Sequence, residues 1–249
     1  MTDKGTTFTV GFSGAGAADA YEGVLVPRLF TPCAVYLLTR LGLHPGEILL
    51  DVACGTGVVA RLAAPVLGTA GRVFARDLTE AMIERGGSER LPADSAPIEY
   101  GVAPADRLDI ADEAMDVVTC QQGLQFFPDA PEAVREMHRV LRPGGRVGIA
   151  VWRSIDECPL WAAAQAATAQ RLDETQAAVL SAPFSWPGEE ALLDVLREAG
   201  FNDLVVSTHT VVMHFDARDA TRALGLSAGP DDAVEIPART LVGTGRRPP

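Results

Sequence analysis

Basic residues are scarce in this chain of 249 residues. Lysine and arginine together number 21 against 33 aspartate and glutamate residues, so the formal net charge is −12 and the sequence pI is about 4.7. Nucleic-acid phosphates and anionic membrane surfaces both attract basic proteins. The charge balance therefore argues against nucleic-acid and membrane partners, and it favours a small or weakly charged substrate.

Cysteine is also sparse, and no two of the four cysteines have the spacing of a C-x-x-C metal or redox motif. Cys33, Cys54 and Cys120 lie in apolar runs, which is typical of reduced, partly buried thiols and predicts a cytoplasmic protein. The N-terminus has no basic segment followed by an apolar one, so we expect no signal peptide. No uninterrupted apolar run approaches the roughly 20 residues that span a bilayer.

Histidine is scarce too, and no cluster of His, Cys and Asp has metal-ligand spacing, which predicts a protein without a bound metal. The composition is otherwise that of an ordinary globular domain, with 47% hydrophobic and 22% charged residues. The length suits one large α/β domain, and we expect residues 1–249 to form it. The sequence does not predict an oligomeric state.

Strand and helix patterns alternate between residues 47 and 152, which predicts right-handed βαβ units and a parallel sheet. The predicted strands are Glu47–Ala53, Arg72–Arg76, Ile98–Val102, Asp116–Gln121 and Arg146–Trp152; the predicted helices are Val58–Leu67, Thr79–Arg85 and Pro131–Leu141. Arg142-Pro143-Gly144-Gly145 is a stop-and-turn signal between the last helix and the last strand.

The flanking segments differ from this alternating core of residues 43–152. We expect residues 1–42 to form an N-terminal helical lid, with two short helices in 17–42 interrupted at Pro27 and Pro32. We expect residues 153–200 to form a small helical cap, with helices in 157–180 and Glu189–Ala199. We expect residues 201–249 to form C-terminal antiparallel strands at Leu204–Phe215 and Val234–Thr244, with a turn at Ser227–Asp232.

A glycine-rich turn, Asp51-Val52-Ala53-Cys54-Gly55-Thr56-Gly57, joins the first strand of the core to its first helix. Glycines let the backbone turn sharply and approach a ligand, and the helix N–H groups point at that ligand. Asp77 follows the next strand, where it can hold both hydroxyls of a ribose; alternatively it is an acid that stabilises the next helix N-terminus. Because residues 55–60 also pass as a dinucleotide pattern, the loop by itself fits both NAD(P) and S-adenosylmethionine.

Four segments of the chain resemble the class I S-adenosylmethionine-dependent methyltransferases, especially the ubiquinone/menaquinone-biosynthesis-like methyltransferase group. They are Leu49–Gly57, Asp77–Met82, Met115–Phe127 and Arg135–Val151 with its Leu141-Arg142-Pro143-Gly144-Gly145. The resemblance extends from about Ala17 through the last strand. It implies an α/β, Rossmann-like, seven-stranded and mostly parallel sheet with helices on both faces, the last strand antiparallel, and S-adenosylmethionine as cofactor.

The resemblance also implies roles for single residues. Asp51 and the backbone of Ala53, Cys54, Gly55 and Gly57 would cradle the methionine part of the cofactor, and Asp77 would hold the ribose. Leu78 and Met82 would pack on the adenine. Gln121, at the end of the fourth strand, would face the methionine amino group or the substrate.

The sequence departs from the family in three places. Relatives usually carry Gly-Asp-Ala after the third strand, with the Asp on the adenine amino group, where this chain has Ala103-Pro104-Ala105. Losing one charge-assisted hydrogen bond costs about 1.5–3 kcal/mol, and Asp106 is the available substitute. Arg76 stands where relatives usually have a small or apolar residue, and the stretch 216–233 is short for the group.

Four side chains are candidates near the reacting carbon: Gln121, Gln122, Trp152 and Tyr21. Ligands of open α/β sheets bind at the carboxyl ends of the strands, where Gln121, Gln122 and Trp152 fall. Each can also have a purely structural role, namely loop polarity for the glutamines, a cavity wall for Trp152 and helix packing for Tyr21. Phe126-Phe127-Pro128 and the 157–180 helices are candidates for the lining of an apolar acceptor pocket.

The favoured hypothesis is methyl transfer from S-adenosylmethionine to a small-molecule acceptor by in-line displacement, in a biosynthetic or secondary-metabolite pathway. The donor is already activated, so positioning and water exclusion are the main tasks and no fixed catalytic signature is expected. The alternative is a cyclase or isomerase that keeps the fold but has lost methyl transfer, motivated by Pro104 and the short C-terminal region. A third hypothesis, that the protein is an NAD(P)-dependent oxidoreductase, rests on the glycine pattern alone.

Overall fold

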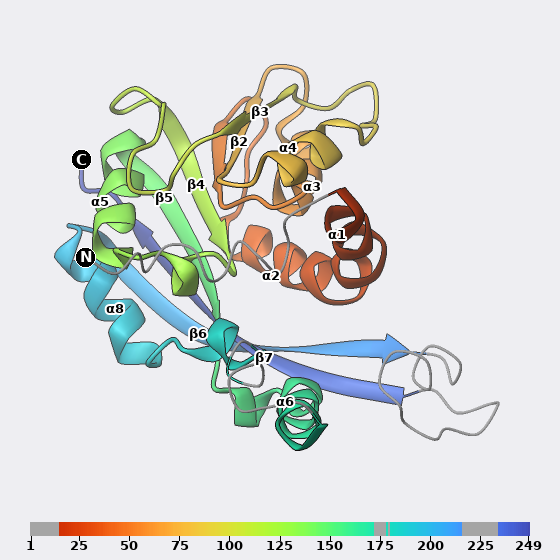
Figure 1. Cartoon of the computed structure of the whole chain (residues 1–249). Coiled ribbons are helices and arrows are strands. Elements are labelled where there is room, and N and C mark those ends of the chain that lie inside the picture. The colour runs from red at the N-terminus through yellow and green to blue at the C-terminus, as the bar shows by residue number, and fades with distance from the viewer. Residues whose placement is uncertain (1–14, 172–177, 179, 216–233) are drawn as a thin grey trace, which may run out of the picture.

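The protein is an open, twisted seven-stranded α/β sheet with the strand order β3-β2-β1-β4-β5-β7-β6 (Figure 1). The computed structural model describes residues 15–171, 178, 180–215 and 234–249. The strands are β1 Ile48–Val52, β2 Arg72–Asp77, β3 Ile98–Val102, β4 Met115–Gln121, β5 Leu141–Trp152, β6 Asn202–Phe215 and β7 Val234–Arg246. Strand β7 runs antiparallel to both β5 and β6. The predicted Rossmann-like, mostly parallel sheet is confirmed, while the turn predicted at Ser227–Asp232 lies outside the described residues.

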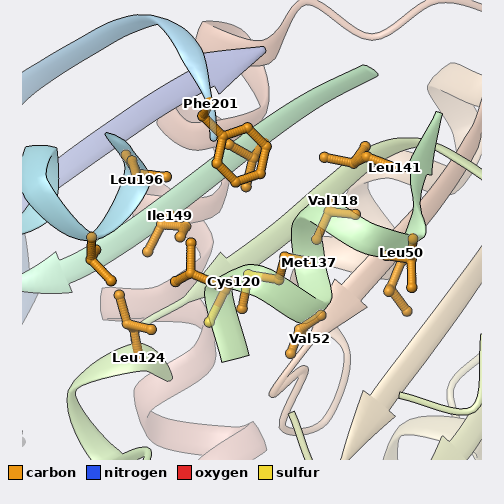
Figure 2. Close-up of a cluster of buried hydrophobic side chains, with 14 of the residues drawn as sticks. Leu50, Val52, Val118, Cys120, Leu124, Met137, Leu141, Ile149, Leu196 and Phe201 are labelled. Carbon is orange, nitrogen blue, oxygen red and sulfur yellow. The ribbon is translucent and has the colours of Figure 1, made fainter. Parts of the chain in front are cut away.

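Helices cover both faces of the sheet because its central strands are apolar on both sides. Helices α2 (Thr31–Leu41) and α3 (Val58–Leu67) pack on one face; α5 (Ala130–Val140) and α8 (Glu189–Glu198) pack on the other. Successive side chains of a strand point to opposite faces. Leu49 therefore joins the core under α2 and α3, and Leu50 joins the core under α5 and α8. Figure 2 shows the second core, in which Met137 and Leu196 meet the central strands.

The N-terminal segment is one helical run and not the two interrupted helices that the sequence predicts. It comprises α1 (Ala15–Ala20), a π-helix over Tyr21–Phe30 and α2. Proline lacks an N–H and clashes with a preceding carbonyl in a regular α-helix, and the wider π turns around Pro27 accommodate it. Pro32 falls at the start of α2, a position that tolerates proline.

This helical run is longer and more apolar than the sequence pattern predicts. By length and composition, Ala18–Leu41 is long and apolar enough to cross a membrane, with a mean hydropathy of 1.3 and 33% of the window buried. Its buried side chains include Leu37, which is fully buried, and Leu41, and both pack in the core against the sheet. Within this fold the run is therefore a sheet-packing helix.

The Pro-Gly-Gly segment forms a bulge inside β5. The sequence predicts a helix through Leu141 and a strand from Arg146, whereas α5 ends at Val140 and Leu141 already pairs with Met115. The next register pair joins Val117 to Arg146, so residues 142–145 loop out between the two pairs. Gly144 has a φ of +77°, a conformation that suits glycine.

Strands β6 and β7 continue beyond the rest of the sheet as a two-stranded arm (Figure 1). Pairing of β5 with β7 ends at Trp152 and Thr240, while β6 and β7 stay paired to Phe215 and Val234. Helix α6 (Pro159–Arg171) packs against β7 in this arm. Of the predicted cap, α6 therefore rests on the arm at the end of β5, whereas α8 packs on the face of the sheet.

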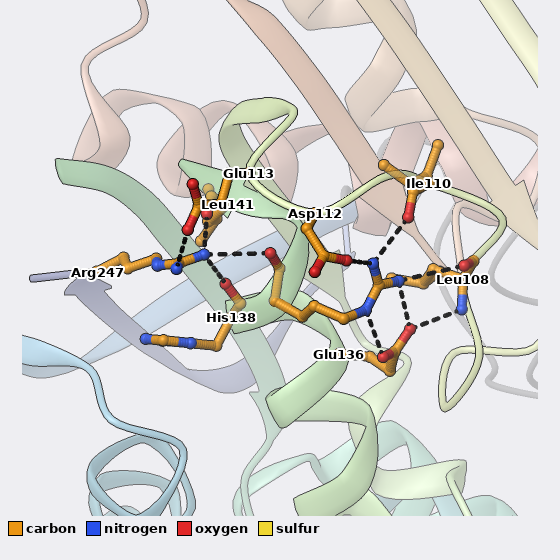
Figure 3. A network of polar contacts seen from close by, with 9 residues as sticks. Leu108, Ile110, Asp112, Glu113, Glu136, His138, Leu141 and Arg247 are labelled. Carbon is orange, nitrogen blue, oxygen red and sulfur yellow. Dashed lines mark hydrogen bonds and ion pairs between the residues drawn. The ribbon is translucent and has the colours of Figure 1, made fainter. Parts of the chain in front are cut away.

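The long connection between β3 and β4, residues 103–114, is fixed by two arginines (Figure 3). Arg139 of α5 donates to the carbonyl oxygens of Leu108 and Ile110 and pairs with Asp112 and Glu136. Arg247 donates to three carbonyl oxygens at the end of α5 and pairs with Glu113. These contacts hold a segment without regular structure as it returns from the end of β3 to the start of β4.

Candidate active site

A continuous cavity of about 510 Å³ opens at the carboxyl ends of the parallel strands. Residues at or just after the ends of five strands contribute to it: Ala53 after β1, Asp77 at the end of β2, Ala103 after β3, Gln121 at the end of β4 and Trp152 at the end of β5. The N-terminal helical run contributes Tyr21, Leu25, Leu29 and Phe30. The cavity therefore lies where open α/β sheets bind their ligands.

The glycine loop turns from β1 into α3 through three left-handed residues, Ala53, Gly55 and Gly57, with φ values of 54°, 55° and 83°. Ala53 and Gly55 line the cavity. Gly57 instead faces Tyr100, and a Cβ atom there would lie 2.5 Å from the tyrosine hydroxyl. Cys54 is buried in the core beneath α3. Only part of the loop predicted from the sequence therefore borders the cavity.

Asp51 lies beneath the loop and does not line the cavity, in contrast to the implied role of cradling methionine. Its Oδ1 accepts a hydrogen bond from the Thr119 hydroxyl (2.9 Å), and its Oδ2 accepts one from the Ala60 N–H (3.2 Å) near the start of α3. Burial raises the pKa of Asp51 to about 7, although both hydrogen bonds favour the charged form. The side chain is placed to hold the loop and the α3 N-terminus.

Asp77 lines the cavity and ties two backbone segments together. Its Oδ2 accepts from the Gly55 N–H at 2.8 Å, and its Oδ1 accepts from the Thr79 N–H at 2.9 Å. Burial raises its pKa, against the opposing effect of these N–H donors. The bond to Thr79, at the start of α4 (Glu80–Gly87), matches a helix-terminus role, and the place in the cavity matches a ribose-binding role.

The wall beside Asp77 is apolar and contains the position that departs from the family pattern. Leu78 and Met82 line it from one side, and Ala103, Pro104 and Ala105 line it from the other. Leu78 is 65% exposed, so part of this wall is open to solvent. Asp106 also borders the cavity, so a carboxylate is present two residues after Pro104.

Arg76 explains why this wall stays in place. Its guanidinium is buried and turned toward β3: Nε donates to Asp109 (2.7 Å) and Nη2 donates to Glu99 (2.9 Å). Gly101 makes room for it, since a Cβ atom there would lie 3.0 Å from the arginine Cζ. Asp109 belongs to the same connection as Pro104. The unusual arginine thus anchors the wall, a role that its sequence context does not predict.

The N-terminal helical run covers the glycine loop. A Cβ atom on Gly55 would lie 3.3 Å from the Tyr21 hydroxyl, and the Tyr21 ring stacks on Phe30 with centroids 4.9 Å apart. Glu22 accepts a hydrogen bond from the Thr56 hydroxyl and pairs with Arg61 at 2.6 Å. Burial raises the pKa of Tyr21 far above its usual range, so the hydroxyl stays neutral. Tyr21 is therefore both a packing residue and a lining residue.

The far end of the cavity is aromatic and carries two buried amides. Trp152 lies 6.2 Å from Trp161 and 6.3 Å from Phe30 between ring centroids, and all three line the cavity. Gln121 donates from Nε2 to the Phe30 carbonyl oxygen (3.2 Å), and Gln122 donates from Nε2 to the Thr240 hydroxyl (3.0 Å).

Phe126, Phe127 and Pro128 also line this end, as the sequence predicts. Trp161 comes from the 157–180 stretch that the sequence also names, whereas Phe30 and Pro183 line the cavity without having been singled out, because only the fold brings their segments together here. Among the described residues, no three His, Cys, Asp or Glu side chains gather closely enough to hold a metal ion.

Sequence comparisons identify relatives of known class. Residues 50–149 match the family model described as a methyltransferase domain. The chain is 30% identical over 219 residues to the ubiquinone/menaquinone biosynthesis C-methyltransferase of Hydrogenovibrio crunogenus, covering 80% of this chain and 84% of the relative. It is 27% identical over 207 residues to the demethylmenaquinone methyltransferase of Staphylococcus epidermidis, covering 76% and 83%.

Solved structures share the fold. Phosphoethanolamine N-methyltransferase 2 of Haemonchus contortus, solved with S-adenosylhomocysteine, superposes with a TM-score of 0.67 at 17% identity, covering 100% of this chain and 61% of its own. The [4+2]-cyclase SpnF superposes with a TM-score of 0.54 at 22% identity, covering 88% and 80%. The sequence relatives favour S-adenosylmethionine over a nicotinamide cofactor. The chain belongs to the class I S-adenosylmethionine-dependent methyltransferases, in the ubiquinone/menaquinone-biosynthesis-like group.

Proposed function

We propose that this enzyme methylates a small-molecule acceptor in a biosynthetic pathway. The observation that carries the proposal is the continuous cavity of about 510 Å³, which extends from Asp77 to Trp152. Its size and its mostly apolar lining are typical of small-molecule sites. One relative is named for demethylmenaquinone and another for ubiquinone and menaquinone biosynthesis, which supports a biosynthetic role. The four cysteines are buried free thiols, which supports a cytoplasmic setting.

The cofactor would lie along the β1, β2 and β3 side of the cavity. Asp77 presents a carboxylate there for the ribose hydroxyls, and the left-handed Gly55 allows close approach of the ligand to the backbone. Leu78, Met82 and Pro104 form apolar walls for the adenine, with Asp106 at the edge. The buried Oε1 atom of Gln121 has no hydrogen-bond partner, and it fits the ammonium group of the methionine part.

S-adenosylmethionine supplies a methyl group on a cationic sulfur, which is activated before it binds. The chain's own residues then need to orient the acceptor and to exclude water. Tyr21 and Phe30 cover the cavity from the N-terminal run, and Trp152 closes it at the end of β5. Gln121 and Gln122 lie between these walls, where they can orient polar groups of the acceptor.

Calorimetry tests the cofactor half of this proposal. S-adenosylhomocysteine should bind to the wild type, and Asp77→Asn should weaken binding about tenfold or more, because a hydrogen bond to a charged group contributes about 1.5–3 kcal/mol. Asp194→Asn is the matched control, since Asp194 is an exposed carboxylate of α8 away from the cavity. If the wild type binds neither S-adenosylmethionine nor S-adenosylhomocysteine, the proposal is wrong.

Product analysis separates methyl transfer from the cyclase or isomerase alternative. The fold of a [4+2]-cyclase resembles this one, but the likeness extends to the fold alone. Mass spectrometry of acceptor mixtures incubated with enzyme and S-adenosylmethionine should reveal a methylated product. A rearranged product of unchanged mass, with no methylated product, would support the alternative.

A further inference from the structure

The cavity wall after β3 has no side-chain acceptor at the position where relatives of this chain carry an acid. Pro104 has an apolar ring and no N–H, and it lies between two alanines that also line the cavity. Its carbonyl oxygen already accepts the Arg107 N–H at 3.3 Å. Leu78 and Met82 form the facing side of this end, so both sides are apolar.

The polar side chains that line this end of the cavity are engaged or exposed. They are Asp77, Thr79 and Asp106. Asp77 accepts the N–H groups of Gly55 and Thr79, and the Thr79 side chain also bonds to Asp77. Asp106 is an exposed residue of the hydrogen-bonded turn 104–107. Among the described residues, no buried side-chain acceptor without a partner belongs to this end.

The turn that carries Asp106 is held on both sides. Before it, the Ala103 N–H donates to the Asp77 carbonyl oxygen at 3.1 Å. After it, Asp109 accepts from the buried Arg76 at 2.7 Å. These bonds keep Asp106 at the surface, where a carboxylate must give up bound water before it can bond to a ligand. The net contribution of such a bond is small.

This end of the cavity is also open to solvent. Leu78, directly after β2, is 65% exposed, and Val102, the last residue of β3, is 52% exposed. The two strands are neighbours, with Asp77 opposite Val102. Water therefore reaches the edge of the apolar walls, and a polar group of a ligand at this edge keeps its hydration.

We propose that Pro104 abolishes recognition of the purine 6-position, so that this chain binds cofactors whose 6-amino group is absent or carries a substituent. This inference rests on the proposed function, because it concerns the cofactor half of the same cavity. An analogue is rejected strongly only where it leaves a buried polar group unpaired, and these walls contain none. Affinity then comes from the apolar contacts of the purine and from the ribose at Asp77.

Calorimetry on the full chain tests this inference with three ligands. They are S-adenosylhomocysteine, its 6-deamino analogue, in which hydrogen replaces the amino group, and its N6-benzyl derivative. Both analogues should bind to the wild type within about threefold of S-adenosylhomocysteine, because the amino group gains no more than a weak net hydrogen bond.

Pro104→Asp supplies the missing carboxylate and should create the specificity that the wild type lacks. This variant should bind S-adenosylhomocysteine about tenfold more tightly than the 6-deamino analogue, because a charge-assisted hydrogen bond is the stronger kind. Pro104→Ala is the matched control, since it removes the ring without adding an acceptor, and its affinity ratio should stay within about threefold. Asp106→Ala should leave the ratio unchanged as well.

Three results would overturn the inference: a tenfold preference of the wild type for S-adenosylhomocysteine over the 6-deamino analogue, no binding of the N6-benzyl derivative, or a ratio in Pro104→Asp as small as that of the wild type. A wild-type preference that disappears in Asp106→Ala would assign the recognition to Asp106 instead. Each result can occur while S-adenosylhomocysteine still binds, so failure of the inference is distinguishable from failure of the proposed function.

Discussion

The two halves of the cavity are built in different ways. The cofactor half, around Asp77, is assembled from neighbours in sequence: Asp77 accepts from Thr79, two residues away, and from Gly55, 22 residues away. The acceptor half is assembled from distant segments: Gln121 reaches Phe30 across 91 residues, and Gln122 reaches Thr240 across 118. Local motifs therefore describe the half that we propose for the cofactor, whereas tertiary packing builds the half that we propose for the acceptor.

This contrast predicts that substitutions in the cofactor half affect stability and cofactor affinity together. The largest effect is expected for Gly57→Ala, because φ is +83° and the new Cβ would lie 2.5 Å from the Tyr100 hydroxyl. Backbone strain and overpacking together should lower the free energy of unfolding by about 3 kcal/mol in a urea titration. Adding Tyr100→Phe should recover part of the loss, because it removes the clashing oxygen. Equal losses with and without Tyr100→Phe would show that the clash plays no part.

A second prediction concerns pH and the same half. The folded state raises the pKa of Asp51 to about 7 from its ordinary value near 4, so its stabilising contribution is complete below about pH 4 and is lost as the pH rises through 7. Between pH 5 and 8 this group should lower the free energy of unfolding by about 2–3 kcal/mol. Asp51→Asn should flatten that part of the profile, whatever its stability at pH 5. If the stability of Asp51→Asn falls as steeply between pH 5 and 8 as that of the wild type, the pH dependence of stability comes from other groups.

Arg76 tests whether the adenine wall depends on its anchor. Arg76→Met keeps much of the side-chain volume but removes the bonds to Glu99 and Asp109, which should loosen residues 103–114. Affinity for S-adenosylhomocysteine should fall about five- to tenfold, equivalent to the loss of one or two net hydrogen bonds. Arg72→Met is the matched control, because Arg72 pairs with the same Glu99 at the surface and does not contact Asp109. Unchanged affinity for S-adenosylhomocysteine in Arg76→Met would mean that residues 103–114 keep their position without the bonds to Arg76.

The smallest effect is expected for Trp161→Leu in the acceptor half. Trp161 is only partly buried and comes from the cap helix α6, so the free energy of unfolding should change by about 1 kcal/mol or less. Affinity for S-adenosylhomocysteine should stay within about twofold in calorimetry, while binding of an apolar aromatic probe such as naphthalene weakens. A large loss of affinity for S-adenosylhomocysteine in Trp161→Leu would show that the two halves of the cavity do not bind their ligands independently.

Those parts of the site that rest on local chemistry could be predicted from the sequence. The turn after β1 and the acid after β2 are recognisable because glycines and a carboxylate at the ends of neighbouring strands are typical of a nucleotide-binding edge. Pro104 is recognisable as a departure from the family pattern, but the contact of Arg76 with the connection that follows Pro104 is not, because the bond from Arg76 to Asp109 spans 33 residues. The role implied for Asp51 at the ligand stays a prediction, and the structure places its side chain beneath the loop and outside the cavity lining, because a motif does not reveal which side of a turn faces the cavity.

By itself the sequence determined the α/β class, the seven strands and the cofactor loop, because hydrophobic periodicity and glycine positions act over a few residues. Tertiary structure alone decided the continuous path of the N-terminal helix through Pro27, the place of α6 on the β6–β7 arm, and the meeting of Phe30, Trp152 and Trp161. It also decided the direction of the Gln122 amide, which depends on the proton of a hydroxyl three strands later in the chain. Such contacts follow from packing energies summed over distant segments, and no local pattern carries them.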